Sequence, residues 1–252
     1  MEQRRRLASL ASALTHRTSG GGIQTVIGGN RSSHLKLGII GLGAIGLDLV
    51  RLCGPEGADP ALARVDIVAV LVQRPRSSQE RAELGLSANT QLTTDVEEWF
   101  GAGPFDAVLE VAGHSAVREL GARVLGTGAE LLVTSVGAFA DELLLDALIA
   151  AADQASTRLN IPSAGIGALD ILGAAAVGGL DSVTMTVRKD PTAWFGTIAE
   201  ERFDLHEINT KGEPHVLFEG TAREGAAMYP QNVNISAAVA LAGIGALLDH
   251  CS

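Results

Sequence analysis

Apolar positions follow two different spacings along the chain from residue 35 onward. Short apolar runs bounded by glycine or charged residues, such as Leu35–Ile40, are typical of buried parallel strands. They alternate with longer stretches in which apolar residues recur at helical spacing, beginning at Ala44. Strands that alternate with helices predict an α/β fold with a doubly wound parallel sheet.

This alternation continues to about residue 162 and then changes. Further strands are predicted within residues 64–76, 105–114, 130–138 and 158–162, and helices over 78–86, 115–126 and 141–155. From residue 183, polar and apolar residues alternate one by one, which is typical of a strand with one solvated face. Strands over 183–189 and 216–220, followed by a small-residue helix over 224–243, therefore predict a smaller α+β domain with a mixed or antiparallel sheet.

The turn between the first strand and the first helix reads G-x-G-x-x-G, with Gly41, Gly43 and Gly46 at the fixed positions. In dinucleotide-binding folds the first glycine permits the tight turn, the second lets the pyrophosphate approach, and the third lets the helix pack closely. Unpaired amides at the positive end of the helix then face the phosphates. We predict a Rossmann-type NAD(P) site here; the alternative is a glycine-rich turn without a ligand.

The residues after the second strand predict which dinucleotide is accepted. A carboxylate at this position would bind the adenosine ribose hydroxyls and repel a 2′-phosphate. The chain instead has Gln73 and Arg74, and Arg74 or Arg76 is suited to pairing with a phosphate. We therefore expect NADP to be accepted as well as NAD. The alternative is that both arginines are solvated loop charges.

Several segments are expected to border the nicotinamide, because ligands of open α/β sheets lie beyond the carboxyl ends of the strands. One strand ends at Glu110, Gly113 and His114, and the next ends in the small residues 135–138. His114 is either an acid–base group or, as is commoner for a lone histidine, a structural or binding one. The small residues of 163–170 can bring backbone amides close to a ligand.

Polar side chains in the second part of the chain are candidates for holding a substrate. Asn232 and Asn234 either cap the last helix or bind a carboxamide or carboxylate. Arg188, Lys189 and Arg223 are candidate partners for carboxylates, or plain surface charges.

Composition excludes several classes of function. A formal net charge of −10 argues against a nucleic-acid or anionic-membrane partner, because either favours a basic face. The two cysteines, Cys53 and Cys251, are too few for a disulfide framework and lack the C-x-x-C spacing of a zinc site, so we expect a reducing compartment and no metal. No uninterrupted apolar stretch predicts a transmembrane helix.

The first 33 residues differ from the acidic remainder, because they carry five arginines and one acidic residue. They are either an organelle transit segment, an extension outside the fold, or the result of a start codon placed too far upstream. The predicted domains are therefore a leader over 1–33, a Rossmann domain over 34–162 and a substrate and dimerisation domain over 163–252. A cytoplasmic protein is expected, or a mitochondrial or plastid one if the leader is a transit segment.

Taken together, short motifs from residue 41 to residue 234 resemble the L-aspartate dehydrogenase family. In chain order they are GLGAIG (41–46), EVAGH (110–114), SVGA (135–138), GIGALD (165–170), VGGL (177–180), RK (188–189), AWFGT (193–197), FEGTARE (218–224) and YPQNVN (229–234). The resemblance implies NAD- or NADP-dependent oxidation of L-aspartate to iminoaspartate, which hydrolyses to oxaloacetate and ammonia and feeds NAD biosynthesis. It also implies that Asn234 contacts the cofactor and that Gly165 stands where the family has a cofactor-binding alanine.

The predicted cofactor-binding residues are Gly41, Gly43, Ala44, Ile45, Gly46, Arg74, Gly165 and Asn234. No catalytic residue is assigned, because the family's active-site histidine lies well beyond the asparagine matched by Asn234, whereas this sequence ends at Ser252. We therefore expect a C-terminally shortened member, with L-aspartate as substrate and a homodimeric assembly. The alternatives are a non-catalytic NAD(P)-binding member of the same family and, more distantly, an oxidoreductase acting on another amino acid or a sugar.

Overall fold

The computed structural model describes residues 34–53, 62–163, 167–221, 224–225, 228–229 and 234–243. The described residues form two compact units. The first is drawn from Met1–Ser135 and Asp146–Gly165, and the second from Val136–Leu145 and Ile166–Ser252. The predicted leader, residues 1–33, lies outside the described residues. The predicted boundary between residues 162 and 163 stays a prediction.

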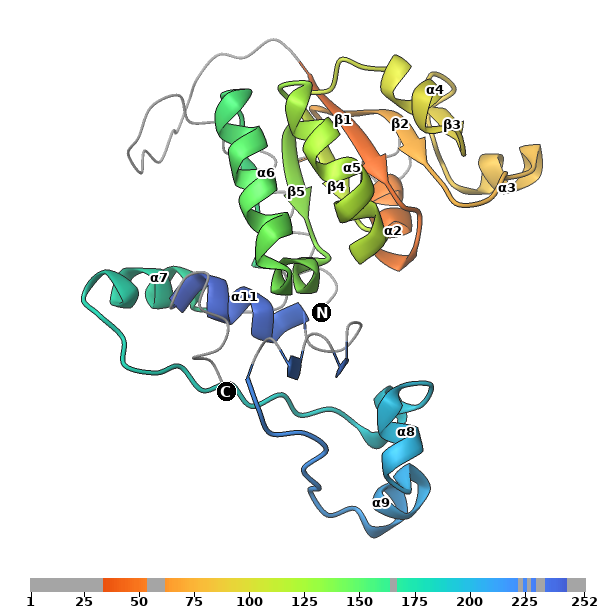
Figure 1. The fold of residues 1–252 in the computed structure, drawn as a ribbon. Coiled ribbons are helices and arrows are strands. Elements are labelled where there is room, and N and C mark those ends of the chain that lie inside the picture. Colours follow the sequence, from red (N-terminus) through yellow and green to blue (C-terminus); the bar gives the residue numbers. More distant parts are fainter. Residues whose placement is uncertain are drawn as a thin grey trace. The chain divides into compact units, whose positions relative to one another are not determined.

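The first unit is built on a six-stranded parallel sheet with the order β3-β2-β1-β4-β5-β6 (Figure 1). The strands are β1 (Leu35–Ile40), β2 (Val65–Leu71), β3 (Gln91–Thr93), β4 (Ala107–Glu110), β5 (Glu130–Val133) and β6 (Leu159–Asn160). This is the order of the doubly wound dinucleotide-binding fold, with the topological switch between β1 and β4. The predicted Rossmann-type doubly wound parallel sheet is confirmed.

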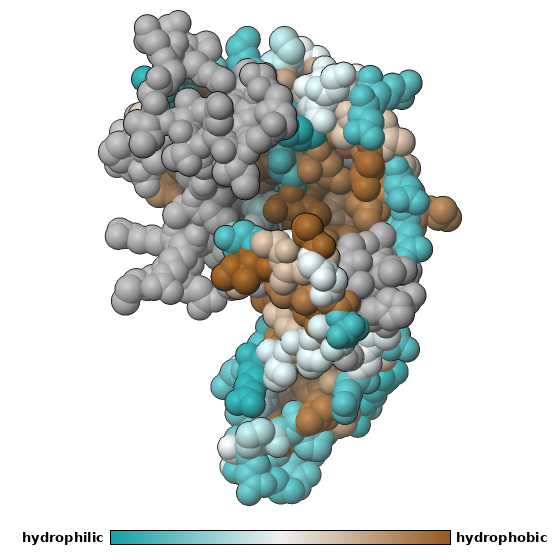
Figure 2. Space-filling model, turned by 90° about the vertical axis from the view of Figure 1, so that its left-hand side faces the viewer, coloured by the Kyte–Doolittle hydropathy of each residue, from teal (hydrophilic) through white to brown (hydrophobic). Residues whose placement is uncertain are grey.

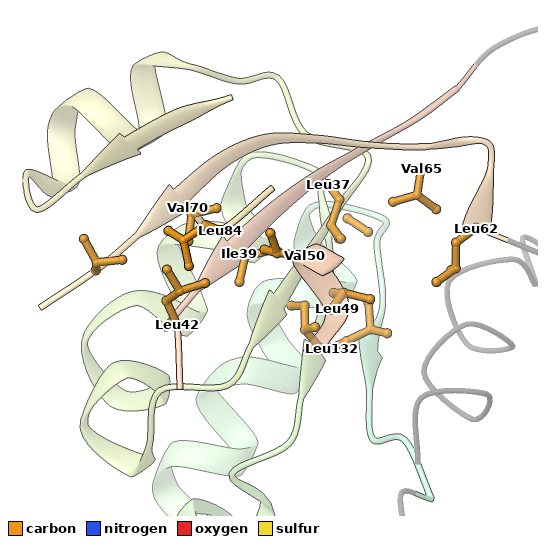
Figure 3. Packing of buried hydrophobic residues seen from close by; sticks show 13 residues of the cluster. Leu37, Ile39, Leu42, Leu49, Val50, Leu62, Val65, Val70, Leu84 and Leu132 are labelled. Atoms are coloured by element: carbon orange, nitrogen blue, oxygen red, sulfur yellow. The ribbon is translucent and has the colours of Figure 1, made fainter. Parts of the chain in front are cut away.

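Apolar side chains from β1 and the elements beside it form the core of this unit (Figure 3). Leu37 and Ile39 of β1 are fully buried, as expected for a central parallel strand covered on both faces. Helix α2 (Ala44–Cys53) adds Leu49 and Val50, whose side chains are also inaccessible to solvent. The core therefore fixes the angle at which the glycine turn joins β1 to α2.

Four further helices belong wholly or mainly to the first unit. They are α3 (Ser78–Glu83), α4 (Val96–Gly101), α5 (His114–Gly126) and α6 (Glu142–Gln154). Helices α5 and α6 lie side by side (Figure 1), where Gly121 of α5 leaves room for the side chain of Leu148. The predicted helices over 115–126 and 141–155 are confirmed, whereas β3 and α4 were not predicted.

The second unit consists of short helices joined by extended segments. They are η2 (Val136–Ala140), α7 (Leu169–Val177), η3 (Pro191–Trp194), α8 (Ile198–Arg202), α9 (Leu205–Lys211) and α11 (Asn234–Gly243). Helix α11 packs against α7 and η2. A separate aromatic cluster forms around Trp194 and Tyr229, whose ring centroids lie 5.3 Å apart in an edge-to-face arrangement.

The two strands predicted for this unit are absent from its described residues. Residues 184–189 and 216–220 are not paired as strands, and Val183 forms only an isolated bridge. The alternation that suggested the first strand is nevertheless real, because Val183 is buried and Met185 and Val187 are half-buried between exposed neighbours. Alternation fixes which side chains face inward, but a strand also needs a partner for its backbone hydrogen bonds.

Several large apolar side chains of the second unit are exposed to solvent: Leu143, Ile171, Val177 and Val216. Apolar surface is also visible among the described residues in Figure 2, beside polar side chains. None of the helices in the described part of the chain is long and apolar enough to span a membrane.

Candidate dinucleotide site

The glycine motif after β1 has no room for a side chain at its first and third glycines, but it has open space at the second. Gly41 has φ +101°, and a Cβ there would lie 2.8 Å from the backbone of Ala112. A Cβ at Gly46 would lie 2.7 Å from the carbonyl oxygen of Gly41. A Cβ at Gly43 would meet nothing within 4 Å. The first and third glycines are therefore required by the fold, whereas Gly43 leaves open space.

Helix α2 begins in this open space. Gly43 and Ala44 are exposed, Ile45 is half-buried, and Leu47 donates to the carbonyl of Gly43 at 2.9 Å. The amides of the first helical turn precede that hydrogen bond and so have no acceptor one turn earlier within the helix. An anion beside Gly43 would accept from such amides and be stabilised by the helix dipole. The turn therefore fits the pyrophosphate of a dinucleotide.

A buried carboxylate organises the next strand end along the sheet. Glu110, the last residue of β4, is 1% exposed. Its Oε1 accepts from the amides of Ala112 and Gly113 at 2.8 and 2.7 Å and from the hydroxyl of Ser135 at 2.9 Å. Its Oε2 accepts from the amide of Ser135 at 3.1 Å. An ionised carboxylate is purely an acceptor, so it matches this set of donors.

This carboxylate links two strand ends to the glycine turn. The Glu110 side chain holds the turn that follows β4, and the backbone of that turn, at Ala112, is the group that packs on Gly41. It also holds Ser135, which follows β5. Glu110 therefore acts as a positioning residue whose partners all lie at the carboxyl edge of the sheet. The sequence placed Glu110 at a strand end but did not reveal that Ser135 is its partner.

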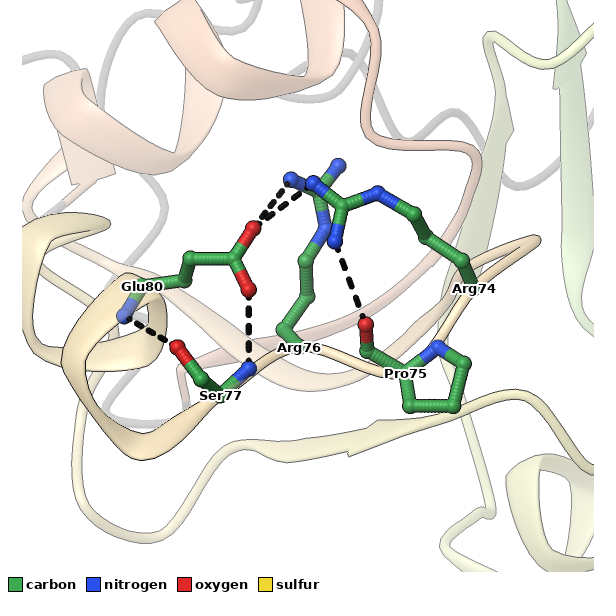
Figure 4. A network of polar contacts seen from close by, with 5 residues as sticks. All are labelled: Arg74, Pro75, Arg76, Ser77 and Glu80. Carbon is green, nitrogen blue, oxygen red and sulfur yellow. Dashed lines mark hydrogen bonds and ion pairs between the residues drawn. The ribbon is translucent and has the colours of Figure 1, made fainter.

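At the end of β2, two arginines share one carboxylate (Figure 4). Glu80 Oε1 accepts from Arg74 Nη2 at 2.6 Å and from Arg76 Nη1 at 3.3 Å. Its Oε2 accepts from the Ser77 amide at 2.9 Å, while the Ser77 hydroxyl accepts from the Glu80 amide at 3.2 Å. Arg74 also donates to the carbonyl of Pro75 at 3.3 Å. Neither arginine is thus a solitary loop charge.

The pKa values of this network move in the direction that keeps it ionised. The hydrogen bond from Arg74, followed by that from the Ser77 backbone, lowers the pKa of Glu80 to about 2. The hydrogen bond from Arg74 to Glu80 also raises the pKa of Arg74 above its ordinary value. Glu80 was not predicted as a site residue, although Ser77 and Glu80 form the S-x-x-E capping box that opens α3 and is legible in the sequence.

In the second unit, Asn234 begins α11 and reaches the backbone of η2. Its Oδ1 accepts from the amide of Gly137 at 2.9 Å, which joins segments 97 residues apart in the sequence. A cap on α11 was one expectation for this side chain and a cofactor contact was the other. The hydrogen bond to Gly137 ties η2 to the start of α11, and the cofactor contact stays a prediction.

The other candidates are placed less informatively. His114 is the first residue of α5 and is half-buried, directly after Gly113 with φ +138°. Arg188 and Lys189 are exposed, and the Lys189 ammonium lies 5.5 Å from the centre of the Trp194 ring.

Four residues singled out in the sequence lie outside the described residues: Gly165, Arg223, Asn232 and Cys251. Within the described ranges, no group of three or more His, Cys, Asp or Glu residues is arranged to hold a metal ion.

Two family models match successive parts of the chain. The model described as "Homoserine dehydrogenase, NAD binding domain" matches residues 41–162, and "Aspartate dehydrogenase, C-terminal" matches residues 170–248. The first match contains the glycine turn, Glu110 and the Glu80 network. The second begins at Asp170, in the second unit.

Full-length relatives extend these matches. An L-aspartate dehydrogenase of Ralstonia pickettii (strain 12J) is 37% identical over 219 residues, which are 86% of this chain and 76% of the relative. An L-aspartate dehydrogenase of Pseudomonas aeruginosa is 40% identical over 212 residues, 84% of this chain and 75% of the relative.

Among solved structures, the aspartate dehydrogenase of Thermotoga maritima matches with a TM-score of 0.62 at 22% identity, covering 86% of this chain and 76% of that one. At this identity the likeness shows the fold. The identity to the bacterial relatives extends over both parts of the chain, and the glycine turn within it has the geometry that a dinucleotide requires. The chain therefore belongs to the L-aspartate dehydrogenase family.

Proposed function

We propose that this protein is an NAD(P)-dependent L-aspartate dehydrogenase that oxidises L-aspartate to iminoaspartate, which hydrolyses to oxaloacetate and ammonia. The observation that carries the proposal is the turn between β1 and α2, open only at Gly43, in a chain whose relatives are named L-aspartate dehydrogenase. Nothing in the described residues favours the non-catalytic alternative. The iminoaspartate would feed NAD biosynthesis.

The nicotinamide ring, when bound, supplies the acceptor for the hydride that leaves the α-carbon of aspartate. The chain's own residues then have to hold the dinucleotide and orient the diacid. Gly43 and the first turn of α2 would hold the pyrophosphate, and Glu110 would keep the neighbouring strand ends in place. Arg188 and Lys189 are candidate partners for the substrate carboxylates. The proton acceptor for the amine is not assigned to any described residue.

We also propose a homodimer in the cytoplasm, with no nucleic-acid or membrane partner. The exposed apolar side chains Ile171 and Val177 of α7 support a self-association surface, since burial of such side chains stabilises an interface. The net charge of −10 supports the absence of a polyanionic partner.

The proposal is tested by following reduced nicotinamide while the purified chain is incubated with L-aspartate and either NAD or NADP. D-Aspartate, L-glutamate and L-malate serve as matched substrates that differ in chirality, length or the amino group. We expect NAD or NADP to be reduced in the presence of L-aspartate and not in the presence of the other three compounds. Binding of the dinucleotide in calorimetry without reduction by L-aspartate would overturn the enzymatic proposal and establish the non-catalytic alternative, and reduction with another substrate would overturn the assigned specificity.

A further inference from the structure

The Glu80 network follows β2, where the 2′ position of the adenosine ribose of a bound dinucleotide is expected. The amide of Gly41 donates to the carbonyl of Leu71, the last residue of β2, at 2.9 Å. The glycine turn and the end of β2 are thus adjacent at one edge of the sheet. In dinucleotide-binding folds, the side chains that follow the second strand contact the ribose 2′ position. Arg74 and Arg76 occupy that part of this chain.

The two guanidinium groups do not present their full charge there. Glu80 contributes one negative charge to a cluster with two positive charges, so a 2′-phosphate would meet a net charge of +1 rather than +2. Glu80 takes one donor from each arginine, and a guanidinium has five. The arginines therefore keep donors for a phosphate, but the carboxylate beside them opposes its charge.

We infer that Glu80 is a specificity-determining residue, which weakens the binding of a 2′-phosphate to Arg74 and Arg76 and so allows NAD to compete with NADP. This inference rests on the proposed dinucleotide site. NAD has no phosphate at the 2′ position, so its binding is not opposed by the Glu80 charge. The network makes the cofactor preference a balance between two cations and one anion from the same loop and helix.

The position of Glu80 is fixed by the backbone as well as by the arginines. Glu80 is the third helical residue of α3, and its Oε2 accepts from the amide of Ser77, the N-cap. A lowered pKa of about 2 keeps it ionised throughout the neutral range. The carboxylate is consequently held beside the guanidinium groups before a dinucleotide binds.

The sharpest test is Glu80→Gln. Glutamine also serves in a capping box, so the substitution keeps an acceptor for the Ser77 amide. It removes the negative charge and replaces the oxygen that accepts from Arg74 and Arg76 by an amino group, so both guanidinium groups are released for a phosphate. For a unit charge roughly 6 Å from a phosphate in a water-like medium, we expect NADP to bind about three- to tenfold more tightly, with NAD changed less than about twofold. Calorimetric titration of each dinucleotide, without aspartate, gives the two dissociation constants.

Glu83→Gln is the matched control. Glu83 lies on the same helix and loses the same charge, but its carboxylate accepts from Gln79 instead of an arginine. We expect it to leave the NADP to NAD affinity ratio unchanged. A second variant, Arg74→Gln, keeps Glu80 and removes one cation, and it should lower the affinity for NADP selectively. It tests the same network if Glu80→Gln fails to fold by circular dichroism.

The outcomes separate this inference from the proposed function. If NAD binds but Glu80→Gln leaves the affinity ratio at the wild-type value, or changes it no more than Glu83→Gln does, the inference is overturned alone. If the folded wild-type chain binds neither dinucleotide, the proposed function fails and this inference fails with it. A selective gain for NADP that is absent from Glu83→Gln supports the inference.

Discussion

Replacing Glu110 by glutamine should destabilise the sheet edge by a measurable amount, although the two side chains have nearly the same shape. Glu110 is buried and accepts four hydrogen bonds. A glutamine has one carbonyl oxygen and one amino group, so one side of the site would present N–H groups to another donor. The favoured orientation keeps the oxygen on the side of three donors and turns the amino group toward the amide of Ser135.

The expected cost follows from those contacts. Leaving the buried Ser135 amide without an acceptor costs about 1–3 kcal/mol. The other three hydrogen bonds lose the assistance of a full charge, and charge-assisted bonds are about twice as strong as neutral ones. The neutral amide is easier to bury than a carboxylate, which offsets part of that loss. We expect the free energy of unfolding to fall by about 2–4 kcal/mol.

Urea denaturation followed by circular dichroism measures this difference, and Glu130→Gln is the control. Glu130 begins β5 and accepts one hydrogen bond, from Asn160 at 3.2 Å, so its substitution should cost under about 1 kcal/mol. Calorimetry should also show NAD binding weakened about three- to tenfold in Glu110→Gln, because the turn held by Glu110 packs on Gly41. A stability within about 0.5 kcal/mol of wild type would refute the assigned role of Glu110.

The remaining predictions concern the glycine turn, the start of α11 and the half-buried thiol of Cys53. Gly43→Ala should leave the unfolding midpoint in urea nearly unchanged and weaken NAD binding at least tenfold. Gly46→Ala should lower that midpoint, because its Cβ would meet a backbone oxygen at 2.7 Å, and equal losses of stability in the two variants would contradict this. Asn234→Ala should cost about 1–2 kcal/mol in the same assay by removing the acceptor of an η2 amide, and Asn234→Asp, which keeps an acceptor, should cost less. Burial raises the pKa of the Cys53 thiol to about 11, so in a Cys251→Ser background labelling of Cys53 by a thiol reagent should rise steeply only as pH approaches 11. Half-maximal labelling near pH 9.0, the ordinary pKa of a cysteine thiol, would disprove this.

The sheet and its glycine turn could be predicted from the sequence because their determinants are local. Leu35–Ile40 is a short apolar run bounded by glycine, apolar residues recur at helical spacing from Ala44 onward, and the structure confirms both the strand and the helix. The short turn between them contains Gly41 and Gly43, and Gly46 lies in the first turn of α2. By contrast, β3 has only three residues, too few for a period to be recognised, so Gln91–Thr93 and the following α4 were missed.

The second unit was predicted less well, because its patterns depend on partners. The alternation over 183–189 correctly indicates the inward side chains, yet no strand pairs with this segment in the described part of the unit. Residues 169–177 form α7, in which no residue is buried, so the usual contrast between an apolar and a polar face is absent.

Polar site residues show the same division between local and distant partners. The contact of Glu110 with Ser135 spans 25 residues and that of Asn234 with Gly137 spans 97, so the sequence identifies the side chains without their roles. Glu80 lies only six residues after Arg74, within a capping box that the sequence displays. A cation predicted to bind phosphate should therefore be checked against the acidic residues of the next helical turn, because a local partner there changes the charge that a ligand meets.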